Sequence, residues 1–142
     1  MKQIYLNSTS PRRKLLLEQM GIDFELVNNP ISEDVKAGEN PLDYVVRMSK
    51  EKAKAGFGEK GLAIGADTIV SMGNTIFGKP KSVGDAKETL EILSGCEHVV
   101  LTVVAIFDGK KLEHVISESK VQIKKLSYQE IDDYCKTGEP LD

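Results

Sequence analysis

The sequence has no tryptophan and few other aromatic residues. Four phenylalanines and four tyrosines make up 6% of its 142 residues. Proteins that bind single-stranded RNA or DNA stack bases on aromatic side chains, so this scarcity argues against a nucleic-acid-binding module. The chain also lacks an excess of positive charge, because 19 Lys and Arg residues face 22 Asp and Glu residues, for a formal net charge of −3. That balance argues against bulk attraction to nucleic acid or to an anionic membrane.

Cysteines and long apolar runs are scarce too. Cys96 and Cys135 lie far apart and in no metal-ligand spacing, so we expect free thiols in a reducing compartment. No apolar run reaches the length of a transmembrane helix, and the N-terminus has no apolar segment typical of a secretion signal. These absences predict a cytoplasmic protein without a membrane partner.

The order of the predicted elements indicates an α/β fold with a mixed sheet. A chain of 142 residues can bury one core, so we expect a single domain over residues 1–142. Hairpin turns such as Gly73-Asn74 exclude a purely parallel sheet. Cap and stop residues predict helices that begin at Pro11, at Pro41, at Val83 and after Ser127. Apolar patterning predicts strands at 3–7, 24–27, 62–72, 75–77, 98–107 and 112–125.

The stretch Ser8-Thr9-Ser10-Pro11-Arg12-Arg13 predicts a helix N-terminus with cations at the wrong end. Ser10 suits the N-cap and Pro11 the first helical position. Arg12 and Arg13 then lie where the helix dipole is already positive, which is unfavourable by roughly 0.3–1 kcal/mol each. A bound phosphate would supply the missing negative charge, held by the loop hydroxyls and the two guanidinium groups. The apolar stripe predicted for this helix consists of Leu15, Leu16, Leu17 and Met20. The alternative to phosphate binding is an amphipathic helix whose arginines point into solvent.

The strand sequence AIGADTIV at 63–70 carries an isolated carboxylate. Its alternation places Ala63, Gly65, Asp67 and Ile69 on one face. Burying an ionised carboxylate is costly unless it is paired or binds a metal. The small neighbours predict an open space beside Asp67, which would suit a metal or a water nucleophile. A strand-end aspartate bonded to the backbone is an equally good interpretation of this pattern alone.

Other charged residues give weak signals singly. Lys52 flanks the apolar stripe of its helix and could reach a neighbouring cleft, but Lys50 flanks the other side, so the pattern does not choose between them. Glu33 lies in a loop, where solvation is the default, and Lys79 could belong to an ordinary turn. Together, a phosphate-binding loop, several cations and isolated carboxylates favour metal-assisted phosphate-ester chemistry.

Several motifs together resemble the Maf family of nucleoside triphosphate pyrophosphatases. They occur in order along the whole chain: SPRR at 10–13, YVVRMSKEKA at 44–53, GADTIV at 65–70, GKP at 78–80, LSGCEHVVLT at 93–102 and TGEPLD at 137–142. The resemblance implies a cytoplasmic enzyme that hydrolyses a nucleoside triphosphate to the monophosphate and pyrophosphate with a divalent cation, Mg²⁺ or Mn²⁺. The implied fold is that of the inosine triphosphate pyrophosphatases, an elongated mixed sheet with flanking helices.

The resemblance also implies roles for single residues. Asp67 is the expected proton acceptor that activates water, and Glu33 and Asp67 are the expected metal ligands. Arg12 and Thr68 match the subgroup that prefers dTTP and UTP, with modified pyrimidine nucleotides as further candidate substrates. The expected substrate-binding residues are Ser8, Arg12, Arg13, Lys52, Thr68 and Lys79.

One departure from the family pattern concerns the end of the sequence. In the family, GEPLD continues into a lysine- and glutamine-bearing segment of the active site, followed by further strands and a helix. The 142 residues are therefore expected to form a Maf-like domain that lacks the usual C-terminal segment.

Two classes of function remain open at this point. The first is a pyrimidine nucleoside triphosphate pyrophosphatase, whose partner is the nucleotide, with neither nucleic acid nor membrane and with a homodimer left open. The alternative is a non-catalytic nucleotide-binding regulator linked to cell division and septum formation. Asp67 and Glu33 favour the enzyme, because binding of a triphosphate alone gains little from added carboxylates.

Overall fold

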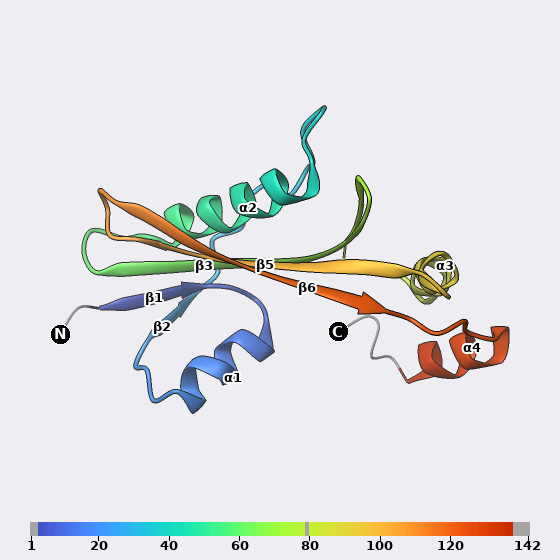
Figure 1. The fold of residues 1–142 in the computed structure, drawn as a ribbon. Helices are drawn as coiled ribbons and strands as arrows, with labels where there is room; N and C mark the ends of the chain where they lie inside the picture. Colours follow the sequence, from blue (N-terminus) through green and yellow to red (C-terminus); the bar gives the residue numbers. More distant parts are fainter. Residues whose placement is uncertain (1–2, 79, 138–142) are drawn as a thin grey trace. The chain divides into compact units, whose positions relative to one another are not determined.

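The computed structural model describes residues 3–78 and 80–137 (Figure 1). The chain forms two compact units. The first unit comprises residues 1–68 and 102–117, and the second comprises residues 69–101 and 118–142. Among the described residues, none of the helices has the length and apolar character needed to cross a membrane.

The strands form one mixed sheet, as the hairpins predicted. Its order is β2-β1-β3-β5-β6, with β4 paired to β3. Strand β1 runs parallel to both β2 and β3, whereas β3 and β4 are antiparallel. The strand bounds are Ile4–Asn7 (β1), Glu25–Val27 (β2), Leu62–Met72 (β3), Thr75–Phe77 (β4), Glu97–Phe107 (β5) and Leu112–Gln122 (β6).

Helix α2 (Pro41–Gly56) is the main helix of the first unit. Asn40 caps it, because the Asn40 side chain accepts a hydrogen bond of 2.8 Å from the Asp43 amide. Leu42, in the first turn, is exposed. The buried residues of this helix are Pro41, Tyr44, Val45, Met48, Ser49, Ala53 and Gly56.

Helix α1 (Pro11–Gln19) begins at the predicted cap, but its predicted apolar stripe is not buried. None of its nine described residues is buried, and the side chains of Leu15 and Leu16 are 52% and 56% exposed. The prediction was wrong because consecutive residues are rotated by about 100° around a helix axis. Three leucines in a row therefore spread around the helix and do not form one apolar face.

At Gly65, the backbone of helix α2 lies directly against the backbone of β3. A Cβ atom at Gly65 would lie 2.2 Å from the Ala53 nitrogen and 2.4 Å from the Ser49 carbonyl oxygen. The open space predicted beside Asp67 is therefore absent at this position, because the backbone of α2 fills it. The small residues on this face of β3 allow helix α2 to come close to the strand. Figure 1 shows α2 running alongside β3.

The second unit contains α3 (Val83–Leu93) and α4 (Tyr128–Lys136). Ala86, Ile131 and Cys135 form a buried cluster, against which Leu90 and Leu126 pack. At the helix start predicted after Ser127, Ser127 and Glu130 form a capping box with both of its reciprocal hydrogen bonds. Cys96 and Cys135 are free thiols, as predicted.

We predict that Gly65→Ala destabilises the protein by about 1–3 kcal/mol, because the added methyl group forces the helix backbone away from the strand. The measurement is the free energy of unfolding from urea denaturation. Gly58→Ala is the matched control, since a Cβ at Gly58 meets no atom within 4 Å. Equal stability of the two variants would contradict the proposed constraint.

Candidate active site

Lys52 joins two carboxylates that lie far apart in the sequence. Its Nζ atom lies 3.2 Å from Oδ1 of Asp67 and 3.2 Å from Oε1 of Glu33. Lys52 comes from α2, Asp67 from β3 and Glu33 from the loop between β2 and α2. The sequence pattern left Lys50 and Lys52 as alternatives, and the structure places Lys52 against the carboxylates.

A buried asparagine fixes the backbone around this cluster. The side-chain amide of Asn7, at the end of β1, donates hydrogen bonds to the carbonyl oxygens of Lys52 (2.9 Å) and Asn29 (2.8 Å). Its side-chain oxygen accepts from the Asn29 amide at 2.9 Å. Asn7 thereby ties the backbone of α2 at Lys52 to the start of the loop that carries Glu33. Our sequence reasoning missed this residue, although a polar residue ending a strand is a recognisable signal.

The Asp67 carboxylate occupies an environment that favours its neutral form. Burial raises its pKa above the ordinary value, while the nearby charges of Lys52 and Arg13 act in the opposite direction and Glu33 reinforces the rise. Titratable groups with raised pKa values in partly buried sites are candidates for proton transfer. Asp67 is therefore a candidate for accepting a proton.

Arg13 joins the cluster through a pair of threonine hydroxyls. Its Nη2 atom donates to Oγ1 of Thr68 at 3.2 Å, and Oγ1 of Thr68 lies 3.0 Å from Oγ1 of Thr102 on β5. Burial lowers the pKa of Arg13, the negative charge of Asp67 raises it, and the neighbouring Arg12 lowers it. Asp67 thus supplies part of the negative charge that the first turn of α1 lacks. Our sequence reasoning missed Thr102, whose only signal is a polar residue within an apolar strand.

The remaining predicted residues belong to the loop and first turn that carry Arg13. The Ser8 hydroxyl accepts a hydrogen bond from the Ser10 amide (3.0 Å), and the Ser10 hydroxyl accepts one from the Arg13 amide (3.4 Å). Arg12 is exposed at the start of α1. The structure thus brings together five of the predicted residues through ion pairs, a hydrogen bond and the chain itself, with Ser8 and Arg12 beside them: Arg13, Glu33, Lys52, Asp67 and Thr68. The predicted Lys79 lies outside the described residues.

The donor set of this cluster suits a cation that is shared with a substrate. Within residues 3–78 and 80–137, no group of three or more His, Cys, Asp or Glu side chains is arranged to hold a metal ion. The described residues therefore form no cage of their own. Mg²⁺ is commonly held by one or two carboxylates together with substrate phosphates, and Glu33 and Asp67 match that requirement.

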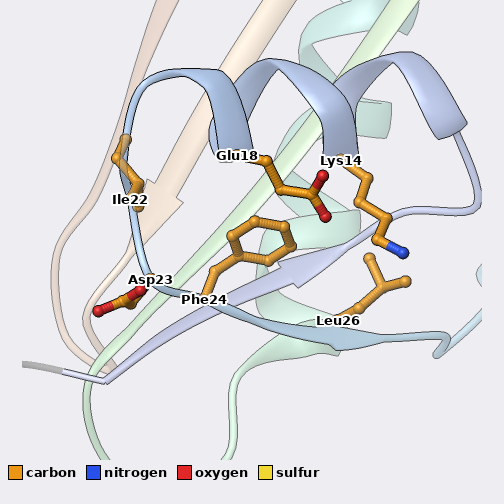
Figure 2. A pocket seen from close by; sticks show the side chains of 6 residues that line it. All are labelled: Lys14, Glu18, Ile22, Asp23, Phe24 and Leu26. Atoms are coloured by element: carbon orange, nitrogen blue, oxygen red, sulfur yellow. The ribbon is translucent and has the colours of Figure 1, made fainter.

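A separate pocket lies between α1 and β2 (Figure 2). Figure 2 shows Lys14 and Glu18 extending from α1 towards Phe24 and Leu26, with Asp23 at the edge; Ile22 also lines the pocket. Two carboxylates and one lysine give this lining no excess of positive charge, so it does not suit a polyanionic ligand. It also contains none of the predicted site residues.

The fold is that of the Ham1 proteins. The chain superimposes on the structure of the Staphylococcus aureus Ham1 protein with a TM-score of 0.57 at 15% sequence identity, covering 85% of this chain and 71% of that one. At this identity the likeness shows the fold alone, and it confirms the predicted α/β class with its mixed sheet.

The sequence comparisons give the family. The sequence model described as Maf-like protein matches residues 3–142. The dTTP/UTP pyrophosphatase of Citrifermentans bemidjiense is 45% identical over 143 residues, covering 98% of this chain and 74% of that protein. The dTTP/UTP pyrophosphatase of Pseudoalteromonas atlantica is 39% identical over 145 residues, covering 98% of this chain and 76% of that protein. The chain belongs to the Maf family of nucleoside triphosphate pyrophosphatases, which are hydrolases, and it spans about three quarters of the length of these relatives.

We predict that Lys52→Met raises the pKa of Asp67 further, because the substitution removes the cation that favours the charged carboxylate. The measurement is a titration of the Asp67 carboxyl carbon by NMR. Lys50→Met removes the same charge from the other flank of the helix and is expected to leave the Asp67 pKa unchanged. An unchanged or lowered pKa in Lys52→Met would show that this ammonium does not control Asp67.

Proposed function

We propose that the protein hydrolyses dTTP and UTP to the nucleoside monophosphate and pyrophosphate. The observation that carries the proposal is the Lys52 ammonium shared by Asp67 and Glu33, next to the guanidinium of Arg13. A cluster that combines a partly buried carboxylate with two cations suits hydrolysis of a polyphosphate. Membership of the Maf family supports the same reaction.

Asp67 acts in this proposal as the general base. It takes a proton from a water molecule, whose oxygen forms a bond to phosphorus. The bond that breaks lies between the α- and β-phosphates, as the two products require, and pyrophosphate departs with the electron pair of that bond. The raised pKa of Asp67 brings it closer to the operating pH, where a base is most effective. A purely regulatory nucleotide site would have no need for such a carboxylate.

The cations around Asp67 bind the triphosphate. Arg13 and Lys52 are proposed to contact its oxygens directly, because guanidinium and ammonium groups form strong charge-assisted hydrogen bonds with phosphate. Ser8 and Arg12 stand at the same helix N-terminus, where backbone N–H groups favour an anion. Lys79 is proposed as a further phosphate contact by its position in the family motif.

Glu33 and Asp67 would hold a divalent cation, Mg²⁺ or Mn²⁺. When bound, the cation would neutralise charge on the phosphate oxygens and help to orient the triphosphate. The side chain of Glu33 is 62% exposed and that of Asp67 only 14% exposed, so the two ligands differ in how freely they can move. Glu33 is the ligand that can adjust to the metal, whereas Asp67 stays fixed on its strand.

Base preference is assigned to Arg12 and Thr68. A pyrimidine presents a small edge of O2, N3 and O4 that a guanidinium and a hydroxyl can recognise. The relatives named dTTP/UTP pyrophosphatase support this choice of base, and modified pyrimidine nucleotides fit the same edge. Thr68 is exposed and follows Asp67 directly on β3. Because Arg13 donates a hydrogen bond to Thr68, a nucleotide bound by Arg13 would also lie close to Thr68.

We predict that dTTP and UTP are hydrolysed with kcat/KM values at least tenfold above those of ATP and GTP. Tenfold corresponds to about 1.4 kcal/mol, which one or two directional contacts left unpaired by the wrong base can supply. The measurement is pyrophosphate release from the four nucleotides in competition, with Mg²⁺ present. Equal or faster turnover of ATP would overturn the base preference, and no release from any of them would overturn the proposed function.

We predict that Asp67→Asn lowers pyrophosphate release at least tenfold while nucleotide binding is retained, because the amide keeps the shape but cannot accept the proton. The folded protein raises the pKa of Asp67, so the ionised carboxylate costs stability above that pKa. Unfolding at pH 7 should therefore require at least as much urea for Asp67→Asn as for the wild type. Asp23→Asn, in the pocket of Figure 2, is the control with normal activity. Release above a tenth of the wild-type rate would exclude Asp67 as the base.

A further inference from the structure

The position of the Glu33 carboxylate is not explained by its own contacts. Glu33 lies in the loop of residues 28–40, which contains no helix or strand, and its side chain is 62% exposed. A single ion pair whose carboxylate is this exposed rarely holds a side chain in place, since solvent and mobile ions compete with it. The backbone that carries Glu33 must therefore be held by other means.

Two side chains of α2 hold that backbone at the two consecutive carbonyl groups that follow the Glu33 side chain. The Tyr44 hydroxyl donates to the carbonyl oxygen of Glu33 at 2.7 Å. Nη2 of Arg47 donates to the next carbonyl oxygen, that of Asp34, at 2.8 Å. Tyr44 and Arg47 are three residues apart and so lie on the same face of the helix. We call these two residues the loop bracket.

Arg47 is itself fixed by three further contacts. Its Nε and Nη2 atoms bind the two oxygens of Glu39 at 2.7 and 2.8 Å, and its Nη1 atom binds Glu51 at 3.0 Å. Its guanidinium carbon lies 5.6 Å from the centre of the Tyr44 ring. The Arg47 guanidinium holds the pKa of Glu39 at about 2, so this pair stays charged over the whole neutral range. The bracket is thus a preformed unit, with Glu39 tying the end of the loop to the same arginine.

We propose that Tyr44 and Arg47 are positioning residues that set the Glu33 carboxylate against Lys52 by fixing the two consecutive carbonyl groups at residues 33 and 34. The inference rests on the proposed function for the importance of Glu33. It adds that the loop bracket is required for Glu33 to act. Neither residue needs to touch the substrate, and the effect of each passes through Glu33.

This proposal differs from a purely structural role in one measurable respect. If the bracket only stabilised the fold, its loss would reduce activity by the same factor whether or not Glu33 carried a carboxylate. If the bracket acts through Glu33, its loss has no further effect once that carboxylate is gone. Residues that act through one another give non-additive effects, and a double-mutant cycle measures this coupling.

The experiment combines Tyr44→Phe with Glu33→Gln in the full chain. Tyr44→Phe keeps the buried ring and deletes only the hydroxyl, so we expect it to lower kcat/KM for dTTP about fivefold, as the loss of one hydrogen bond would. In the Glu33→Gln background the same deletion should change kcat/KM by less than twofold. Tyr134→Phe, at an exposed position of α4, is the matched control and should leave activity unchanged. A fivefold loss in both backgrounds would overturn the proposal.

A second variant tests the other half of the bracket. Arg47→Lys retains the charge but cannot form the two-pronged contact with Glu39 while also reaching Asp34. We expect it to lower kcat/KM more than Tyr44→Phe does, and again only when Glu33 is present. Rescue by lysine to the wild-type value would show that charge alone suffices and would overturn the role assigned to the geometry of Arg47.

The same cycle is also measured on binding, so that the two proposals can fail separately. Calorimetry with Mg²⁺ and α,β-methylene-UTP, which resists cleavage, reports the affinity of each variant without turnover. We expect Tyr44→Phe to weaken binding only in the presence of the Glu33 carboxylate. A protein that binds this analogue but releases no pyrophosphate from dTTP would overturn the proposed function and leave the bracket supported by its coupling. A protein that does neither would overturn both.

Discussion

The arrangement of the candidate site depends on the backbone contact between α2 and β3 at Gly65. A Cβ atom there would lie 2.2 Å from the Ala53 nitrogen, so only a residue without a side chain permits the helix to come this close. Ala53 follows Lys52 directly, and Asp67 is the next residue on the same face of β3. The close approach therefore sets the distance at which the ammonium of Lys52 meets the carboxylate of Asp67. The distance between Lys52 and Asp67 therefore depends more on this backbone separation than on the lengths of the two side chains.

Helix α2 has two tasks. Its buried residues, among them Val45, Met48 and Ser49, belong to the core. The same helix carries the cation that joins the carboxylates and the two side chains that hold the loop. Because these groups share one rigid helix, any shift of the helix moves the cation and the loop together. Asp67, by contrast, remains on the strand and bears the cost of partial burial, which the neighbouring cations offset in part.

Local patterns predicted the elements well, but contacts between distant segments could not be predicted from them. The caps at Ser10 and Asn40 and the capping box at Ser127 fixed the helix starts, since these signals act within four residues. The alternation around Asp67 gave the correct face of β3. The small residues on that face were misinterpreted as leaving room for a ligand, because spacing along one strand does not reveal which helix packs there. The choice of Lys52 over Lys50, and the parts played by Asn7 and Thr102, likewise depend on neighbours far along the chain.

The exposed leucines of α1 bear on the dynamics of this helix and of the loop before it. A helix of nine residues is too short to be stable by itself, and α1 buries none of its side chains to compensate. Helix α1 is held at its first turn by the Ser10 cap and by the hydrogen bond from Arg13 to Thr68. The opposite end can therefore fray, and local unfolding from there costs less than global unfolding. Arg13 stands at the end that these contacts hold, so opening of the opposite end need not disturb it.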